Sequence, residues 1–178
     1  MVNLKTYSEI VLALLPAYSA LACATLLFAS KRDSLTAEEL KVKSVTIRYM
    51  IASFLMWVFI FVYGYSPEIF IYIGAFAILT FLLIPVLFFR IIRLLTKIDD
   101  KEKFSLFHYL IPILIAGTVW IWSFFVPLGI QVDIIRGLGS IIPKGYETYA
   151  RFYLSASLFR AIVSIIYNTL TILTLYRY

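Results

Sequence analysis

Arg160 is the side chain in this sequence whose type and position best suit chemistry, because a permanent cation lies inside a long apolar stretch. A charge at the centre of a bilayer costs about 2.5–3.5 kcal/mol on insertion scales, so it normally faces a bundle interior or a wet cavity. Three interpretations stay open. The side chain extends to the outer membrane surface, contacts a second subunit, or turns inward beneath an outer cap. In the last case it pairs with Glu68, Asp133 or Glu147, or binds an anionic ligand.

Arg90 and Arg93 form a second basic feature, three residues apart near the end of another apolar stretch. Residues at this spacing share one face of a helix. Basic residues beside a membrane helix hold that end on the cytoplasmic side. We therefore expect the pair to anchor the inner end of its helix. Coupling to a cytoplasmic partner, as a signal relay, is the alternative.

Other reactive side chains are scarce in this chain. His108 is the only histidine and Cys23 the only cysteine, so neither a histidine cluster for a metal nor an internal disulfide can form. The apolar stretches contain no paired carboxylates for acid–base chemistry, and the sequence has no glycine-rich phosphate loop. The sequence therefore predicts no catalytic residue, no metal, no cofactor and no enzymatic activity.

Long apolar stretches make up most of the chain that positions these residues. Of its 178 residues, 62% are hydrophobic and 15% are charged, and the mean hydropathy of +0.94 exceeds what a water-soluble domain of this size can bury. A helix needs roughly 20 residues to cross the hydrocarbon of a bilayer. Five stretches meet that length: Ile10 to Ala29, Val45 to Tyr63, Ile69 to Phe89, Phe107 to Val126 and Phe152 to Leu175. We predict one domain over residues 1–178, an all-α polytopic bundle of about five transmembrane helices.

Lysine and arginine are concentrated in the first and third connections between these stretches and are sparse in the other two. The basic residues of the first are Lys31, Arg32, Lys41, Lys43 and Arg48, and those of the third are Arg90, Arg93, Lys97, Lys101 and Lys103. Because basic residues in short loops resist translocation, these two connections belong in the cytoplasm. The amino terminus is then outside and the carboxyl terminus is cytoplasmic. The net charge of +6 reflects this topology and an attraction to anionic lipid.

Three connections carry signals of local structure. Thr36 and Glu39 have the spacing of a capping box, which predicts a short helix on the membrane surface. The segment from Tyr63 to Glu68 contains a glycine and a proline, which predicts a tight outer turn between the second and third helices. Residues Pro127 to Ala150 mix glycines with isoleucines, which predicts a folded outer cap rather than a solvated loop.

Four segments of the sequence together resemble a known family. They are Pro85 to Thr96 (PVLFFRIIRLLT), Phe104 to Pro112 (FSLFHYLIP), Trp120 to Pro127 (WIWSFFVP) and Ile166 to Tyr178 (IYNTLTILTLYRY). This pattern resembles the membrane portion of bacterial membrane-anchored AraC-type transcription regulators. The pairing of His108 with Pro112 is the most specific element of the likeness. A structural histidine at the inner headgroup boundary is the default role for His108.

In that family, a bundle of membrane helices precedes a cytoplasmic helix-turn-helix domain that binds DNA. The resemblance implies a multi-pass domain of the bacterial inner membrane that receives an unknown signal at the outer face or anchors the regulator, with homodimerisation left open. The sequence ends just after the fifth stretch, so we expect a fragment or a truncated relative that reaches DNA only through a missing carboxyl-terminal domain. The expected mechanism is a shift in helix packing, biased near Arg160 and relayed through Arg93.

The alternative function is a small oligomeric transporter or channel component. An ion path needs several polar groups lined up within the membrane. Arg160 stands nearly alone as a charge inside the apolar stretches, which favours the regulator.

Overall fold

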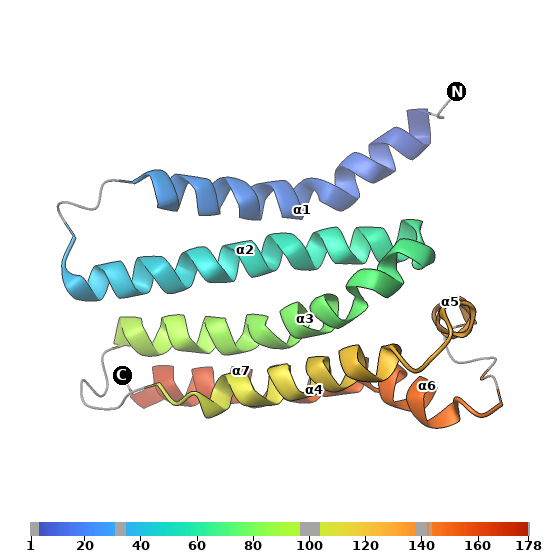
Figure 1. Cartoon of the computed structure of the whole chain (residues 1–178). Coiled ribbons are helices and arrows are strands. Elements are labelled where there is room, and N and C mark those ends of the chain that lie inside the picture. Colours follow the sequence, from blue (N-terminus) through green and yellow to red (C-terminus); the bar gives the residue numbers. More distant parts are fainter. Residues whose placement is uncertain (1–3, 31–34, 97–103, 138–141, 143, 178) are drawn as a thin grey trace.

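The computed structural model describes residues 4–30, 35–96, 104–137, 142 and 144–177, and this part of the chain is all-helical (Figure 1). Its helices are α1 (Leu4–Ala29), α2 (Ala37–Tyr65), α3 (Pro67–Thr96), α4 (Phe107–Ser123), α5 (Leu128–Gly137), α6 (Glu147–Leu154) and α7 (Ala156–Arg177). The predicted cations Lys31, Arg32, Lys97, Lys101 and Lys103 lie outside the described residues.

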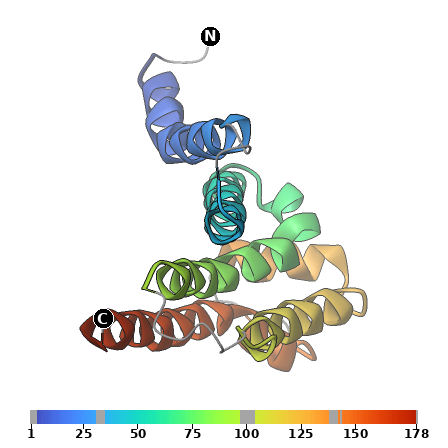
Figure 2. The same ribbon diagram turned by 90° about the vertical axis from the view of Figure 1, so that its left-hand side faces the viewer.

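The long helices run side by side in layers, with α3 in the middle. Helix α1 packs on α2, α2 packs on α3, and α3 packs on both α4 and α7. Figure 2 shows the same order from the end of the bundle. Helices α5 and α6 lie with the α2–α3 turn at one end, here called the cap end. The opposite end, where α7 finishes and α4 begins, is here called the C-terminal end.

The main core forms where α3 meets α4 and α7. Leu82 and Val86 of α3 have no exposed surface, and they pack with Val119 of α4 and Val163 of α7. An apolar helix is buried on all sides only when it has neighbours all round. The almost uniformly apolar sequence of α3 therefore suits its central place, and α3 carries residues of the core along its whole length.

The most buried residues of helix α1 are small. Ala17, Ala20 and Ala24 are buried on the face toward α2, because alanines let two helix backbones approach closely. Many bulky residues of α1 are exposed, and Leu12, Leu26 and Phe28 are each more than 60% exposed. A water-soluble bundle rarely exposes so much apolar surface. In lipid the same surface costs nothing to expose.

Four helical segments are long and apolar enough to cross a membrane. They are residues 9–29 of α1, all of α2, all of α3, and the continuous run of α6 and α7 from Glu147 to Arg177. Helix α4 is apolar but has 17 residues. The predicted all-α class is thus confirmed for the described residues. The fifth span and the orientation remain predictions.

The capping box predicted at Thr36 is present. The Thr36 side chain accepts a hydrogen bond from the backbone of Glu39, and the Glu39 carboxylate accepts one from the backbone N–H of Thr36. The separate surface helix predicted there is wrong, because α2 continues without a break from Ala37 to Tyr65. No proline interrupts this run, so the capped first turn belongs to the long helix itself. The predicted tight turn is correct, and Ser66 alone separates α2 from α3.

The predicted cap contains α5 and the beginning of α6. Gly145, with a φ of +87°, adopts a left-handed conformation that suits glycine and starts the turn into α6. Its N–H donates to the Glu147 carboxylate. The helix therefore begins at Glu147, five residues before the predicted start at Phe152, and a turn at Ser155 separates α6 from α7.

Candidate functional site

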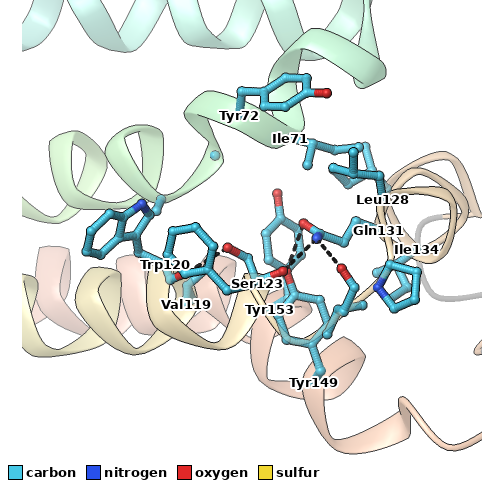
Figure 3. Close-up of a pocket in the computed structure, with 16 residues that line it drawn as sticks. Ile71, Tyr72, Val119, Trp120, Ser123, Leu128, Gln131, Ile134, Tyr149 and Tyr153 are labelled. Atoms are coloured by element: carbon cyan, nitrogen blue, oxygen red, sulfur yellow. Dashed lines mark hydrogen bonds between the residues drawn. The ribbon is translucent and has the colours of Figure 1, made fainter.

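A cavity of about 420 Å³ lies at the cap end, enclosed by α3, α4, α5 and α6 (Figure 3). Its walls are mainly aromatic and aliphatic side chains, including Trp120 from α4 and Tyr149 and Tyr153 from α6. None of its lining residues carries a formal charge. Small-molecule sites are typically cavities of this size, apolar with a few placed polar groups.

Gln131 provides the polar wall of this cavity and is 6% exposed. Its amide nitrogen Nε2 donates to the carbonyl oxygens of Ser123 and Val126, at 2.9 and 2.8 Å. Its Oε1 accepts a long hydrogen bond of 3.5 Å from the Tyr149 hydroxyl. The Ser123 carbonyl at the end of α4 also accepts from the backbone N–H of Val126 at 3.3 Å, and the Val126 carbonyl belongs to the turn that follows α4. One side chain of α5 therefore joins the end of α4 to α6, as Figure 3 shows.

Tyr153 stands between the cavity and the core. Its ring takes part in packing against α3, α5 and α7, and its hydroxyl lies against Gly74 of α3. A Cβ atom on Gly74 would lie 3.2 Å from that hydroxyl, so a side chain there would push the tyrosine aside. Within the described part of the chain, the hydroxyl makes no hydrogen bond. It is available to a ligand in the cavity.

The acidic residues predicted to partner Arg160 lie at the cap end but away from it. Glu68 forms an ion pair with Arg136 of α5, on side chains that are 50% and 60% exposed. Glu147 accepts from the backbone of Gly145, and Asp133 is exposed on α5. The exposed ion pair between Glu68 and Arg136 contributes little stability, about 0–1 kcal/mol. None of these side chains lines the cavity.

Arg160 occupies a lateral groove between α2, α3 and α7. Its guanidinium carbon lies 4.9 Å from the centroid of the Phe81 ring, within the range of a cation–π contact. The predicted ion pair with Glu68, Asp133 or Glu147 is not formed, since Glu68 pairs with Arg136 instead. The predicted place beneath the cap is also wrong. Phe81 lies 14 residues after the start of α3 and 15 before its end, so Arg160 sits at mid-length of the bundle.

A polar cluster at the C-terminal end brings together two of the predicted sites. Arg90 donates from Nη1 to the Tyr109 hydroxyl at 2.8 Å, and its guanidinium lies over the Phe104 ring at 5.3 Å. Nδ1 of His108 lies 2.8 Å from the Tyr167 hydroxyl of α7. The Phe104 and His108 rings are in contact, with centroids 4.5 Å apart. Arg90 and His108 are thus members of one aromatic cluster that joins α3, α4 and α7.

Two other predicted residues, Arg93 and Pro112, lie close to this polar cluster. Arg93, one turn beyond Arg90, is half-buried and within electrostatic range of His108. Pro112 is fully buried in the packing of α4 and takes no part in the polar cluster. Nε of Arg90 is buried and has no hydrogen-bond partner among the described residues. The cluster is therefore a packed junction whose polar groups are mostly paired.

Sequence reasoning missed the residues of the cavity. Gln131, Tyr149 and Tyr153 fell in the predicted cap or at the edge of the last apolar stretch, where no role was assigned to them. The signal was available for Gln131, since a lone amide among apolar residues needs buried partners. Nothing in the spacing of the tyrosines indicated that they face one cavity.

A scan of protein-family models and searches of curated proteins and of solved structures find no match to this chain. In the described residues, no group of three or more histidine, cysteine, aspartate or glutamate side chains is placed to hold a metal ion. The function must therefore be argued from the cavity, the groove and the polar cluster.

Proposed function

We propose that this chain is the membrane-embedded sensory domain of a bacterial transcription regulator, which receives a signal at the outer face and relays it to a cytoplasmic DNA-binding domain outside this chain. The observation that carries the proposal is the uncharged cavity at the cap end. It is the place where one small molecule would touch α3, α4, α5 and α6 at once. The resemblance of the sequence to membrane-anchored AraC-type regulators is the reason to propose a cytoplasmic DNA-binding domain as the receiver of the signal.

The proposed topology has five spans in the inner membrane. The fifth is α4 together with the turn that follows it to Val126, which reaches the length that a bilayer requires. With five spans, the two termini lie on opposite sides. Basic residues gather at the C-terminal end, where Lys41, Lys43, Arg90 and Arg177 lie, and this supports a cytoplasmic location of that end.

The cavity suits a neutral ligand. Its lining has no charge to balance, and its free polar groups are the hydroxyls of tyrosine residues such as Tyr153. An uncharged, partly aromatic molecule with a hydrogen-bonding group near Tyr153 would bury apolar surface and satisfy that hydroxyl. A charged molecule would lose its hydration without gaining a partner.

The relay proposed here uses α3 and the run of α6 and α7, which are two of the long helical segments of the bundle. Helix α3 carries Gly74 at the cavity and Arg90 at the polar cluster, and the run of α6 and α7 carries Tyr153 and Tyr167 in the same way. A ligand shifts such a helix pair only if it binds two packings with unequal affinity. The cavity is shaped by the contact of Tyr153 with Gly74, which is where two packings would differ most.

The first test of the regulator hypothesis is the sequence of the gene downstream of this chain. Sequencing beyond the codon for Tyr178 is expected to show further apolar segments and then a basic helix-turn-helix region. A stop codon at that point would contradict the proposal and favour a free-standing bundle such as a transporter component.

Filling the cavity tests the sensory role. Ala75 is partly buried and lines the cavity, so Ala75→Phe in the full-length regulator places a ring where the ligand would bind. We expect this variant to lose the response to the signal, measured as the change in the set of genes whose expression depends on the regulator.

Ala13→Phe is the matched control, because Ala13 is exposed on α1 and far from the cavity. It should leave expression as in the wild type. If both variants behave like the wild type at equal protein level, the cavity is not the signal site.

A further inference from the structure

We propose that the lateral groove around Arg160 binds a single-chain anionic amphiphile of the fatty-acid type, with its carboxylate on the guanidinium and its chain in the groove. The inference goes beyond the sensory proposal, because it concerns a different site and holds whether or not the chain regulates transcription. It requires only that the bundle lies in a bilayer.

The groove consists of two hollows that meet at Arg160 and Phe81. The hollow toward the cap end measures about 350 Å³ and is walled by apolar residues such as Phe59 and Ile78. The hollow toward the C-terminal end measures about 320 Å³ and is walled by residues such as Met56 and Pro85. Both are open at the side, between α2 and α7. Arg160 lies where the two hollows meet, so a ligand with one charged end can place that end on the guanidinium and its chain in the largely apolar hollow toward the cap end.

The guanidinium of Arg160 can still donate hydrogen bonds to a ligand. Arginine stays protonated in proteins and carries five N–H donors in a planar fork. Within the described chain, the contact of Arg160 is with the face of Phe81, which takes up charge but accepts no strong hydrogen bond. A carboxylate matches the fork with two parallel hydrogen bonds, the strongest class available to arginine. Ser157, Ser164 and Asn168 line the same groove from α7 and add polar groups beside the cation.

The described residues do not supply that carboxylate. Their acidic side chains lie near the ends of the long helices or on the cap, and none lies at mid-length of a helix long enough to cross a membrane. A second copy of this chain packed against the groove would therefore bring no acid to the level of Arg160. We therefore assign the partner of Arg160 to a molecule from the membrane.

The depth of Arg160 selects the kind of amphiphile. Phospholipid headgroups are held at the membrane surface, about half of the 30 Å hydrocarbon thickness away from the mid-length of a spanning helix. A fatty acid enters the hydrocarbon as the neutral acid, because a buried charge without a partner is costly and the group takes up a proton instead. In the net binding reaction the proton of the acid passes to water at the membrane surface, and the carboxylate that remains pairs with the Arg160 guanidinium. Charge and depth together thus favour a single-chain carboxylate over a bilayer phospholipid.

The test compares an acid with its neutral ester on the whole chain in phosphatidylcholine nanodiscs. The probes are spin-labelled stearate and its methyl ester, and immobilisation of the label reports binding. We expect Arg160→Leu to weaken stearate binding by at least about tenfold and to leave the ester unchanged, since only the acid uses the guanidinium. Arg160→Lys should retain part of the stearate binding. Arg151→Leu, at an exposed basic residue of α6, is the matched control and should bind both probes as the wild type does.

Three results would overturn the proposal. The first is equal binding of acid and ester by the wild type, and the second is unchanged stearate binding by Arg160→Leu. The third is displacement of the probe by phosphatidylglycerol but not by unlabelled stearate, which would assign the groove to a phospholipid headgroup. Circular dichroism checks that Arg160→Leu is folded. Arg160→Gln keeps a polar side chain but has no charge, and it should lose stearate binding while it still binds the ester.

Discussion

Gln131 shows how a single residue sets the geometry of the candidate site. Its amide donates to two backbone carbonyls, that of Ser123 at the end of α4 and that of Val126 in the turn that follows. The same amide holds α5 over the cavity and accepts a hydrogen bond from Tyr149. The site therefore depends on a residue that has no charge and no reactive atom.

Replacement of this amide tests that role. Gln131→Met keeps the side-chain length but removes the donors. The Val126 carbonyl then loses its side-chain partner, and the Ser123 carbonyl keeps only the backbone N–H of Val126, at a cost of about 1–3 kcal/mol. We expect a lower midpoint of thermal unfolding in detergent than for the wild type. Asp133→Met, at an exposed position of the same helix, should change stability by less than about 0.5 kcal/mol. Equal midpoints for the two variants would show that Gln131 does not hold the cap.

The polar cluster at the C-terminal end is formed by residues that lie far apart in the sequence. Arg90 and Tyr109 are 19 positions apart, and His108 and Tyr167 are 59 apart. From the sequence, Arg90 was interpreted as an anchor and His108 as part of a motif, each by itself. Their shared cluster arises because α3 and α7 both run past the beginning of α4, so that side chains of all three helices meet there.

At the scale of single elements, the start of α2 was the most predictable feature. The spacing of Thr36 and Glu39 indicated a capping box, and both of its reciprocal hydrogen bonds are formed. The length of the capped helix was predicted less well, since a separate surface helix was expected there. A capping box marks where a helix begins and carries no information about where it ends.

Removal of the cap should loosen only the first turn of α2. Thr36→Ala loses the side-chain acceptor, which typically contributes about 0.5–2 kcal/mol. We expect faster amide hydrogen exchange in the first turn of α2, with the core of the bundle unchanged. Thr46→Ala is the matched control, because the Thr46 hydroxyl only bonds to a carbonyl within its own helix. Equal exchange rates for the two variants in that first turn would contradict the role assigned to Thr36.

The last helical run illustrates the limit of hydropathy. Its polar beginning, from Glu147 to Arg151, fell below the apolar pattern, so the predicted start lay several residues late. The helix begins where Gly145 makes the turn and Glu147 accepts from its N–H. Local hydrogen bonding decided that boundary, and apolar content did not.

At the scale of the whole molecule, the proposed orientation makes a direct prediction. In a Cys23→Ala background, Glu147→Cys and Glu38→Cys place single thiols at the cap end and at the opposite end. In intact cells, a membrane-impermeant thiol reagent should label the Glu147→Cys protein and spare the Glu38→Cys protein. The physical reason is the retention of the basic C-terminal end in the cytoplasm.

Permeabilised cells provide the control for this labelling, since both thiols should then react. The reverse pattern in intact cells would invert the orientation and move the cavity to the cytoplasmic side. The cavity and groove would remain, but a signal from outside would no longer reach the first of them directly.

Composition and runs of apolar residues were enough to predict a lipid environment, the helical class and the approximate position of every long helix. Those properties depend on the local sequence and not on contacts with other helices. The packing of the helices decided that α3 is central, that Arg160 faces Phe81 in a lateral groove, and that Gln131 and three tyrosines line a cavity. Almost every face of these helices is apolar, so periodicity does not distinguish a face toward lipid from a face toward protein. Only the tertiary contacts make that choice.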